Sequence, residues 1–153
     1  MDQIDKSILH ILANDAGAQT LEISRAVNLS VPATNKRIAR MKKDGVIVAN
    51  TVLTDGEKVG KPVLAFIFVV LQYAEGVTAF LDFVQKEQDI LECYAISGGY
   101  DYILKVCAED IKKLEQKLLT IKGQKGVVKS QTMISLMEHK CKPTVLPDME
   151  ETT

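Results

Sequence analysis

Basic side chains are concentrated in one short segment, residues 36–43. It holds five of the eight Lys and Arg residues found in the first 60 positions, although the whole chain has a net charge of −1. Long cations on a helix can reach base edges and phosphates, and small residues near the helix N-terminus allow close approach to a DNA groove. A solvated surface helix would show the same charges. The residues expected to contact DNA are Ser30, Pro32, Ala33, Lys36, Arg37, Arg40 and Lys43.

A second candidate site is the turn Gly98-Gly99-Tyr100-Asp101. Backbone amides beside the glycines could face a ligand carboxylate, and the Asp101 carboxylate could pair with an ammonium group. The two features together suit a free amino acid, and the hydroxyls of Ser130 and Thr132 could add hydrogen bonds. A plain hairpin turn would explain the same glycines, because glycine supplies the positive φ of a tight turn.

Catalytic and metal chemistry have little support in the sequence. His10 and His139 do not have the spacing of metal ligands, and the three cysteines are too widely spaced for a Cys-x-x-Cys site. No nucleophile with a nearby base can be named, and neither a Gly-x-Gly-x-x-Gly run nor a phosphate loop ending in Gly-Lys-Ser/Thr occurs. We therefore predict that the chain is not an enzyme and needs no metal or cofactor.

Composition places the chain among globular proteins, with 153 residues of which 46% are hydrophobic. No apolar run reaches the roughly 18 residues that a membrane span needs. The opening Met1-Asp2-Gln3 lacks the basic and apolar regions of a secretory signal. An odd number of dispersed cysteines fits a reducing compartment. We expect a cytoplasmic protein without a membrane partner.

The elements that position the basic segment are three short helices. Apolar residues follow helical spacing over residues 2–13, in a second helix with Thr20 as its N-cap, and in a third from Ser30 to Asp44-Gly45. Pro32 is tolerated in the first turn of the third helix. Two helices joined by a short turn, the second one basic, form the helix-turn-helix pattern. β-branched residues then predict an extended linker strand over residues 46–53.

The rest of the chain alternates strands and helices. Residues 63–71 are consecutive apolar residues, typical of a strand buried on both faces, and further strands are expected over 90–97, 101–107 and 127–137. One helix carries Val77, Phe80, Leu81 and Val84, and another begins after Asp110. The order is the ferredoxin-like βαββαβ arrangement, with helices on one sheet face. The other, apolar face is expected to pair with a second copy.

These observations predict an α+β chain in three parts. Residues 1–60 form a winged-helix-like DNA-binding domain with its linker, residues 61–142 a ferredoxin-like sensing and oligomerisation domain, and residues 143–153 a disordered acidic tail.

Several short motifs occur in a particular order along nearly the whole chain. They are Ile4-Asp5, Ile8-Leu9, Leu29-Ser30, Arg37-Ile38, Arg40-Met41, Gly45-Val46-Ile47, Gly98-Gly99-Tyr100-Asp101-Tyr102 and Gly126-Val127 with Thr132. In this order they resemble the leucine-responsive regulator/AsnC family, the feast/famine regulators. The sequence departs from the family pattern near Gly17-Ala18, where an arginine is usual, and at Ala49-Asn50, which replaces a common Gly-Tyr.

The resemblance implies a helix-turn-helix domain joined to an effector domain that pairs sheet to sheet, with dimers assembling into octamers. It further implies that amino acids bind in clefts between dimers. The residues that line such a cleft would be Gly98, Gly99, Tyr100, Asp101, Thr132 and Ile134.

Our main hypothesis is therefore a homo-oligomeric transcriptional regulator that binds double-stranded DNA and responds to a free amino acid. Apolar Met133 and Ile134 favour leucine or methionine as that effector. The alternative is a ligand-sensing regulatory subunit of a metabolic enzyme, in which the helices bind protein and not DNA.

Overall fold

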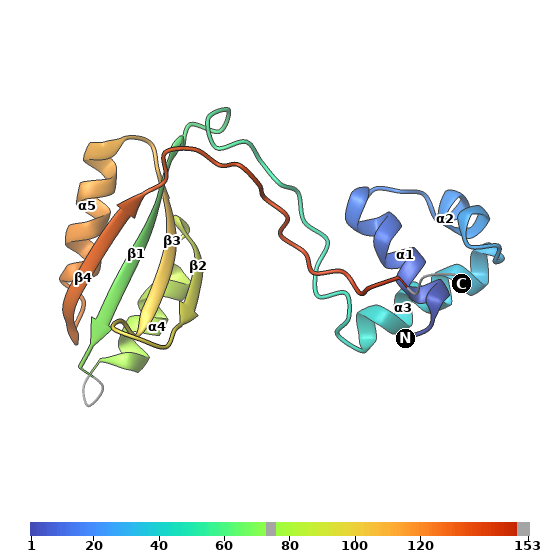
Figure 1. Ribbon diagram of the computed structural model, residues 1–153, viewed down its shortest axis with the longest axis horizontal. Coiled ribbons are helices and arrows are strands. Elements are labelled where there is room, and N and C mark those ends of the chain that lie inside the picture. The colour runs from blue at the N-terminus through green and yellow to red at the C-terminus, as the bar shows by residue number, and fades with distance from the viewer. Residues whose placement is uncertain (73–75, 150–153) are drawn as a thin grey trace. The chain divides into compact units, whose positions relative to one another are not determined.

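The computed structural model describes residues 1–72 and 76–149 and forms two compact units (Figure 1). One unit comprises Met1–Leu53 with Lys140–Thr153, and the other comprises Thr54–His139. Among the described residues, no helix is long and apolar enough to cross a membrane.

The first unit is built on three helices, α1 (Gln3–Asn14), α2 (Thr20–Ala26) and α3 (Val31–Lys43). Helix α1 starts with a capping box, in which the Asp2 carboxylate accepts the backbone N–H of Asp5 at 2.9 Å. Ser30 caps α3 as predicted, with its hydroxyl accepting the N–H of Ala33 at 3.3 Å. Thr20 was predicted wrongly as a cap, because it is already the first helical residue of α2, after Gln19.

Each helix contributes one buried residue to a small apolar core. Ile8, Ile23 and Met41 are at most 2% exposed, and half-buried residues such as Leu12 and Ile38 surround them. The buried stripe of α3 leaves its opposite side in solvent. This is the packing that the helix-turn-helix pattern predicted.

The linker strand predicted over residues 46–53 was wrong, because these residues form no strand in the structure. The side chains of Val48 and Val52 are 90% and 83% exposed. β-branched residues favour strands through packing against neighbouring strands, and within the described residues of this single chain the segment meets no such neighbour.

Residues 143–149, at the start of the predicted tail, contain neither helix nor strand. They belong to the first unit, where the Pro147 carbonyl oxygen lies 3.0 Å from Nε2 of His10. The remaining residues of that predicted tail, 150–153, lie outside the described residues.

The second unit has the predicted βαββαβ order. Its elements are β1 (Val63–Leu71), α4 (Val77–Lys86), β2 (Ile90–Ala95), β3 (Tyr102–Ala108), α5 (Ile111–Lys122) and β4 (Val127–Ile134). The strands pair antiparallel in the order β2-β3-β1-β4. Strand β4 ends sooner than predicted because Ile134 already pairs with Ala65, close to the start of β1 at Val63. Strand β2 also ends two residues early, at Ala95.

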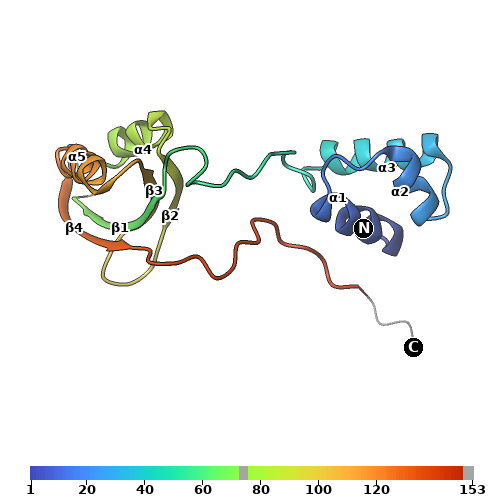
Figure 2. The same ribbon diagram turned by 90° about the horizontal axis from the view of Figure 1, so that it is seen from above.

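Helices α4 and α5 lie on one face of this sheet (Figure 2). Beneath them every second residue of β1, including Ala65, Ile67 and Val69, is fully buried with Phe80 and Leu104. The residues between them are only half-buried in a single chain, so burial of this second face against another copy stays a prediction. The sheet face away from the helices, which we call the open face, carries the alternate apolar residues of β1, Phe66, Phe68 and Val70.

Candidate nucleic-acid interface and effector turn

Helix α3 presents an exposed basic side opposite its buried stripe. Thr34 and Met41 face the core, whereas Lys36 and Lys43 are exposed, and no ion pair of either lysine occurs among the described residues. The predicted contact residues Ser30 and Pro32 are also exposed, and Ala33 is half-buried. Small residues at the helix start and two lysines further along therefore share the accessible surface.

Helices α2 and α3 are fixed to each other by a polar contact as well as by the core. The Thr20 hydroxyl donates to the Asn35 amide oxygen at 3.1 Å. The bond links the first residue of α2 to the second turn of α3. It restrains how α3 is displayed on the unit.

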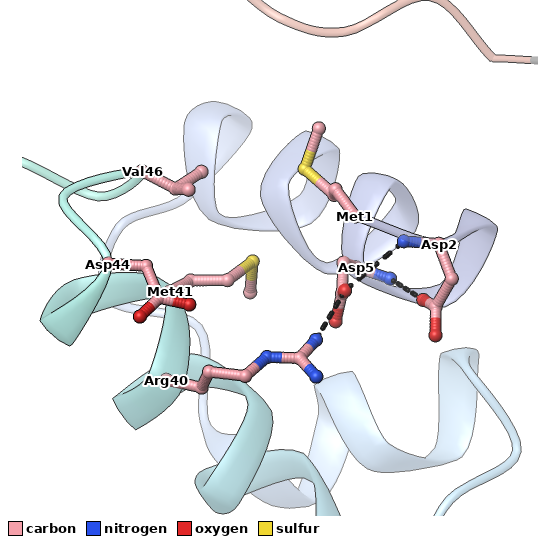
Figure 3. Close-up of a pocket in the computed structure, with 7 residues that line it drawn as sticks. All are labelled: Met1, Asp2, Asp5, Arg40, Met41, Asp44 and Val46. Atoms are coloured by element: carbon pink, nitrogen blue, oxygen red, sulfur yellow. Dashed lines mark hydrogen bonds and ion pairs between the residues drawn. The ribbon is translucent and has the colours of Figure 1, made fainter.

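Arg37 and Arg40, also predicted to contact DNA, form ion pairs with Asp5 of α1 in the single chain. Nη1 of Arg37 lies 2.9 Å from Oδ1 of Asp5 and 2.7 Å from a carboxylate oxygen of Asp2. Nη2 of Arg40 lies 2.6 Å from Oδ2 of Asp5. Figure 3 shows the Arg40 guanidinium pointing from α3 across a hollow toward Asp5. The basic segment thus contains exposed lysines and two arginines that are paired with Asp5, of which Arg37 is 25% and Arg40 53% exposed.

Sequence reasoning missed the role of Asp5. The sequence feature that could have revealed it is an acidic residue on the apolar stripe of a helix. The i, i+3, i+4, i+7 spacing of one buried face is shared by Asp5, Ile8, Leu9 and Leu12. A carboxylate placed there must be paired. The nearby pKa of Asp2 is lowered, first by the hydrogen bond from the Asp5 backbone and then by the one from Arg37, so Asp2 is charged at neutral pH.

The predicted effector turn is tied to the end of β1 through Asp101. Its carboxylate accepts the backbone N–H of Leu71 at 2.8 Å, and its own N–H donates to the Val69 carbonyl at 2.9 Å. Its carbonyl accepts the N–H of Ile96 at 2.9 Å, which closes the turn. Asp101 thus has a structural role, and one of its carboxylate oxygens already carries a backbone hydrogen bond.

The two glycines of the turn differ. Gly98 has a φ of +121°, which a hairpin turn explains. Gly99 does not have positive φ, and a Cβ added to it would meet no described atom within 4 Å. Neither backbone conformation nor crowding within the described chain requires glycine at position 99. A requirement for it would have to come from a ligand or a second subunit.

The Tyr100 side chain lies on the open face. Its ring is 5.4 Å from that of Phe68, with Nζ of Lys129 4.9 Å from its centroid, and its hydroxyl donates to Gln131. Cation and ring attract each other at this distance. Tyr100 is therefore anchored to β1 and β4.

Thr132 and Ile134, the other predicted effector residues, lie elsewhere on the sheet. They pair with Ile67 and Ala65, whose side chains face the helices. Directly paired residues share a face, so both lie on the side opposite Tyr100. The β1 partner of Ile134, Ala65, lies four residues before Val69, whose carbonyl accepts the N–H of Asp101 in the turn. One chain does not bring the predicted effector residues together.

A second polar cluster, which sequence reasoning missed, surrounds Asp89 before β2. Its carboxylate accepts hydrogen bonds from Lys61 and Lys117, and Sγ of Cys107 lies 3.7 Å away. Burial opposes ionisation of Asp89, but the two lysines outweigh it and lower its pKa. The partners are separated by 28 residues on each side, so no local pattern reveals them. Among residues 1–72 and 76–149, no group of three His, Cys, Asp or Glu side chains could hold a metal ion.

Replacing Asp89 with asparagine should lower the free energy of unfolding of the second unit at pH 7 by about 2 kcal/mol, the usual worth of hydrogen bonds to charged groups. The folded pKa is depressed, so the stabilisation is present above the unfolded pKa and disappears as pH falls through the folded value. Wild type and Asp89→Asn should therefore converge in acid. Urea unfolding followed by tyrosine fluorescence measures this, since all four tyrosines lie in residues 54–139. A constant difference down to pH 3 would contradict it.

Fold and site together define a class of protein: a DNA-binding regulator whose trihelical unit is followed by a separate ligand-binding unit. Two family models match the chain accordingly. A winged helix-turn-helix DNA-binding model covers residues 1–48, and the Lrp/AsnC ligand binding domain covers residues 64–145. The chain belongs to the Lrp/AsnC family of transcriptional regulators, as its resemblance predicted.

Relatives and solved structures agree. The HTH-type transcriptional regulator FL11 of Pyrococcus horikoshii is 35% identical over 147 residues, covering 96% of each chain. Regulatory protein AsnC of Haemophilus influenzae is 27% identical, covering 89% of this chain and 91% of its own. A transcriptional regulator of Neisseria meningitidis in complex with L-Met superposes with a TM-score of 0.87 at 27% identity, covering 95% of this chain and 96% of the other. The chain is thus a DNA-binding transcriptional regulator with a ligand-binding domain.

Proposed function

We propose that α3 binds in the major groove of double-stranded DNA, with Lys36 and Lys43 on phosphates and the small residues at its start against base edges. The observation that carries this is the exposed basic side of α3, displayed by a helix packed through Thr20 and Asn35. Recognition helices enter the major groove with their N-terminal residues at the bases. Ser30, Pro32 and Ala33 occupy that position.

The test is binding of the full chain to the duplex upstream of its own gene, measured by fluorescence anisotropy over a range of salt concentrations. Affinity should fall linearly with the logarithm of salt, because lysines release counterions from phosphates. It should also exceed the affinity for a shuffled duplex of the same length. Equal affinities for the two duplexes would reject sequence-specific regulation. The alternative, an enzyme's regulatory subunit, predicts no binding at all.

We infer that the open face joins two copies of the chain. Phe66, Phe68 and Val70 are half-buried there in a single chain, and an apolar area of this kind is seldom left in water. Two subunits would present two α3 helices to one duplex. Further assembly toward an octamer would create the clefts in which Gly98 to Asp101 of some copies meet Thr132 and Ile134 of others. Sedimentation of the purified protein tests this, and a monomer would reject it.

The effector proposed for those clefts is a free amino acid with an apolar side chain, leucine or methionine. Support comes from the ligand-binding domain over residues 64–145, from the L-Met bound to the Neisseria regulator, and from Ile134, which is 44% exposed in one chain. Met133 pairs with Phe66 and therefore lies on the open face. A ligand that binds the folded state at 100 times its Kd adds about 2.7 kcal/mol of stability. Thermal unfolding across the free amino acids should therefore single out leucine or methionine. No shift with any of them would reject the effector class.

Gly99→Ala should separate effector binding from folding. Because a Cβ at position 99 enters open space at an ordinary φ, the free energy of unfolding should change by less than about 0.5 kcal/mol. The thermal shift given by the effector should nevertheless shrink, because the methyl group takes space beside the ligand. Gly98→Ala is the matched control, expected to cost about 1–2 kcal/mol through its positive φ. An undiminished thermal shift in Gly99→Ala would remove this turn from the effector site.

A further inference from the structure

Asp5 is a buried carboxylate that is fully occupied by two cations of the neighbouring helix. Its side chain is 1% exposed, with Arg37 on one oxygen and Arg40 on the other. A buried charge without a partner is among the costliest features a fold can contain. Each arginine that left would therefore remove one of the two charges that compensate the buried Asp5 carboxylate.

Both arginines are on α3, the helix proposed to meet DNA. Arg37 also contacts Asp2, whose N-cap geometry holds its carboxylate beside the Asp5 backbone. An arginine that turned to a phosphate would leave the buried Asp5 carboxylate with a single cation. Both guanidinium groups keep their charge, because arginine stays protonated at all ordinary pH values.

We propose that Asp5, with Asp2, keeps Arg37 and Arg40 paired within the trihelical unit when α3 binds DNA, so that these arginines add no phosphate contacts. This rests on the proposed docking of α3. Lys36 and Lys43 then carry the phosphate attraction. Asp5 is a positioning residue that limits sequence-independent affinity for phosphates. Base contacts therefore contribute a larger share of the free energy of DNA binding.

The variant Asp5→Asn, in the full chain, tests the proposal through the salt dependence of binding to a shuffled duplex. Asparagine keeps the shape of the side chain but frees Arg40 for a phosphate. The slope of log K against log salt should steepen by about 0.9 for each protomer bound. Adding Arg40→Gln to Asp5→Asn should return the slope to that of wild type. A merely structural role for Asp5 would weaken the fold without steepening the slope.

A slope that is unchanged or shallower in folded Asp5→Asn overturns the proposal. So does equal steepening in Asp82→Asn, which removes the same charge from an exposed site on α4. If circular dichroism shows that Asp5→Asn is unfolded, Asp2→Asn replaces it, because asparagine caps a helix as well as aspartate does. That variant weakens the hold on Arg37 and should also steepen the slope. An unchanged slope there overturns the proposal equally.

Failure of the underlying docking has a different signature. Lys36→Gln flattens the slope in the same assay if α3 lies on DNA. An unaffected slope in Lys36→Gln would mean that α3 does not bind the duplex, and it would overturn the docking and this inference together.

Discussion

Replacing Gly126 with alanine should destabilise the βαββαβ unit by about 2–6 kcal/mol. Two penalties combine. Gly126 has a φ of +91°, a conformation that costs an L-residue about 1–3 kcal/mol. A Cβ there would also lie 2.8 Å from Cα of Gly76, and crowding in a packed site costs typically about 1–3 kcal/mol. Since Gly76 meets Gly126 backbone to backbone, no side chain can move aside.

The contact joins the start of α4 to the loop before β4. The Gly126 carbonyl accepts the N–H of Gln72 at 2.7 Å, so displacement of the loop would also break a hydrogen bond at the end of β1. A domain of this size is stable by only about 5–15 kcal/mol. The loss is therefore a large part of the total, and part of the variant should be unfolded at 37 °C.

Urea unfolding followed by tyrosine fluorescence measures the effect, because every tyrosine belongs to this unit. Gly60→Ala is the matched control. It has a φ of +79° in the same unit, but a Cβ there would meet no described atom within 4 Å, so it isolates the backbone strain. If the two variants lost equal stability, the close approach of Gly76 and Gly126 would contribute nothing.

The contact between Gly76 and Gly126 could not be predicted from the sequence. Gly126 appeared in a motif shared with a family, but nothing local indicated that it touches Gly76, fifty residues earlier. By contrast, the helices and strands followed from periodicity, because Val77, Phe80 and Val84 repeat at helical spacing whatever lies around them. Periodicity indicates which face of an element is buried, but it does not indicate which residues pack against that face. The same limit applies to β1, whose open face has no cover in a single chain.

For the proposed DNA interface, the sequence predicted the basic helix but could not distinguish the roles of its cations. Lys36 and Arg40 stand one helical turn apart and have the same charge. Only the position of Asp5 on the packed α1, 35 residues from Arg40, distinguishes them. The proposed effector site could not be assembled from the sequence either, because Gly99 and Ile134 lie apart in one chain and would meet only between copies. Such a site is a property of the assembly.

The double variant Lys36→Gln/Lys43→Gln should lose most DNA binding while keeping its fold. Both side chains are exposed, so their removal leaves the core of Ile8, Ile23 and Met41 intact. Each lysine on a phosphate contributes about 0.9 to the slope of log K against log salt. For two subunits on one duplex, four lost contacts flatten it by about 3.6. At about 0.15 M salt this lowers affinity by a factor on the order of 10²–10³.

Anisotropy titrations from low to high salt supply both affinity and slope. Lys112→Gln/Lys122→Gln is the matched control, since it removes the same charge from exposed positions of α5 in the ligand-binding unit. That control should bind DNA with the wild-type slope, because charge acts on phosphates through contact and is screened within about 10 Å at 0.1 M salt. If both double variants lost affinity equally, attraction would come from overall charge, and α3 would have no special place on the duplex.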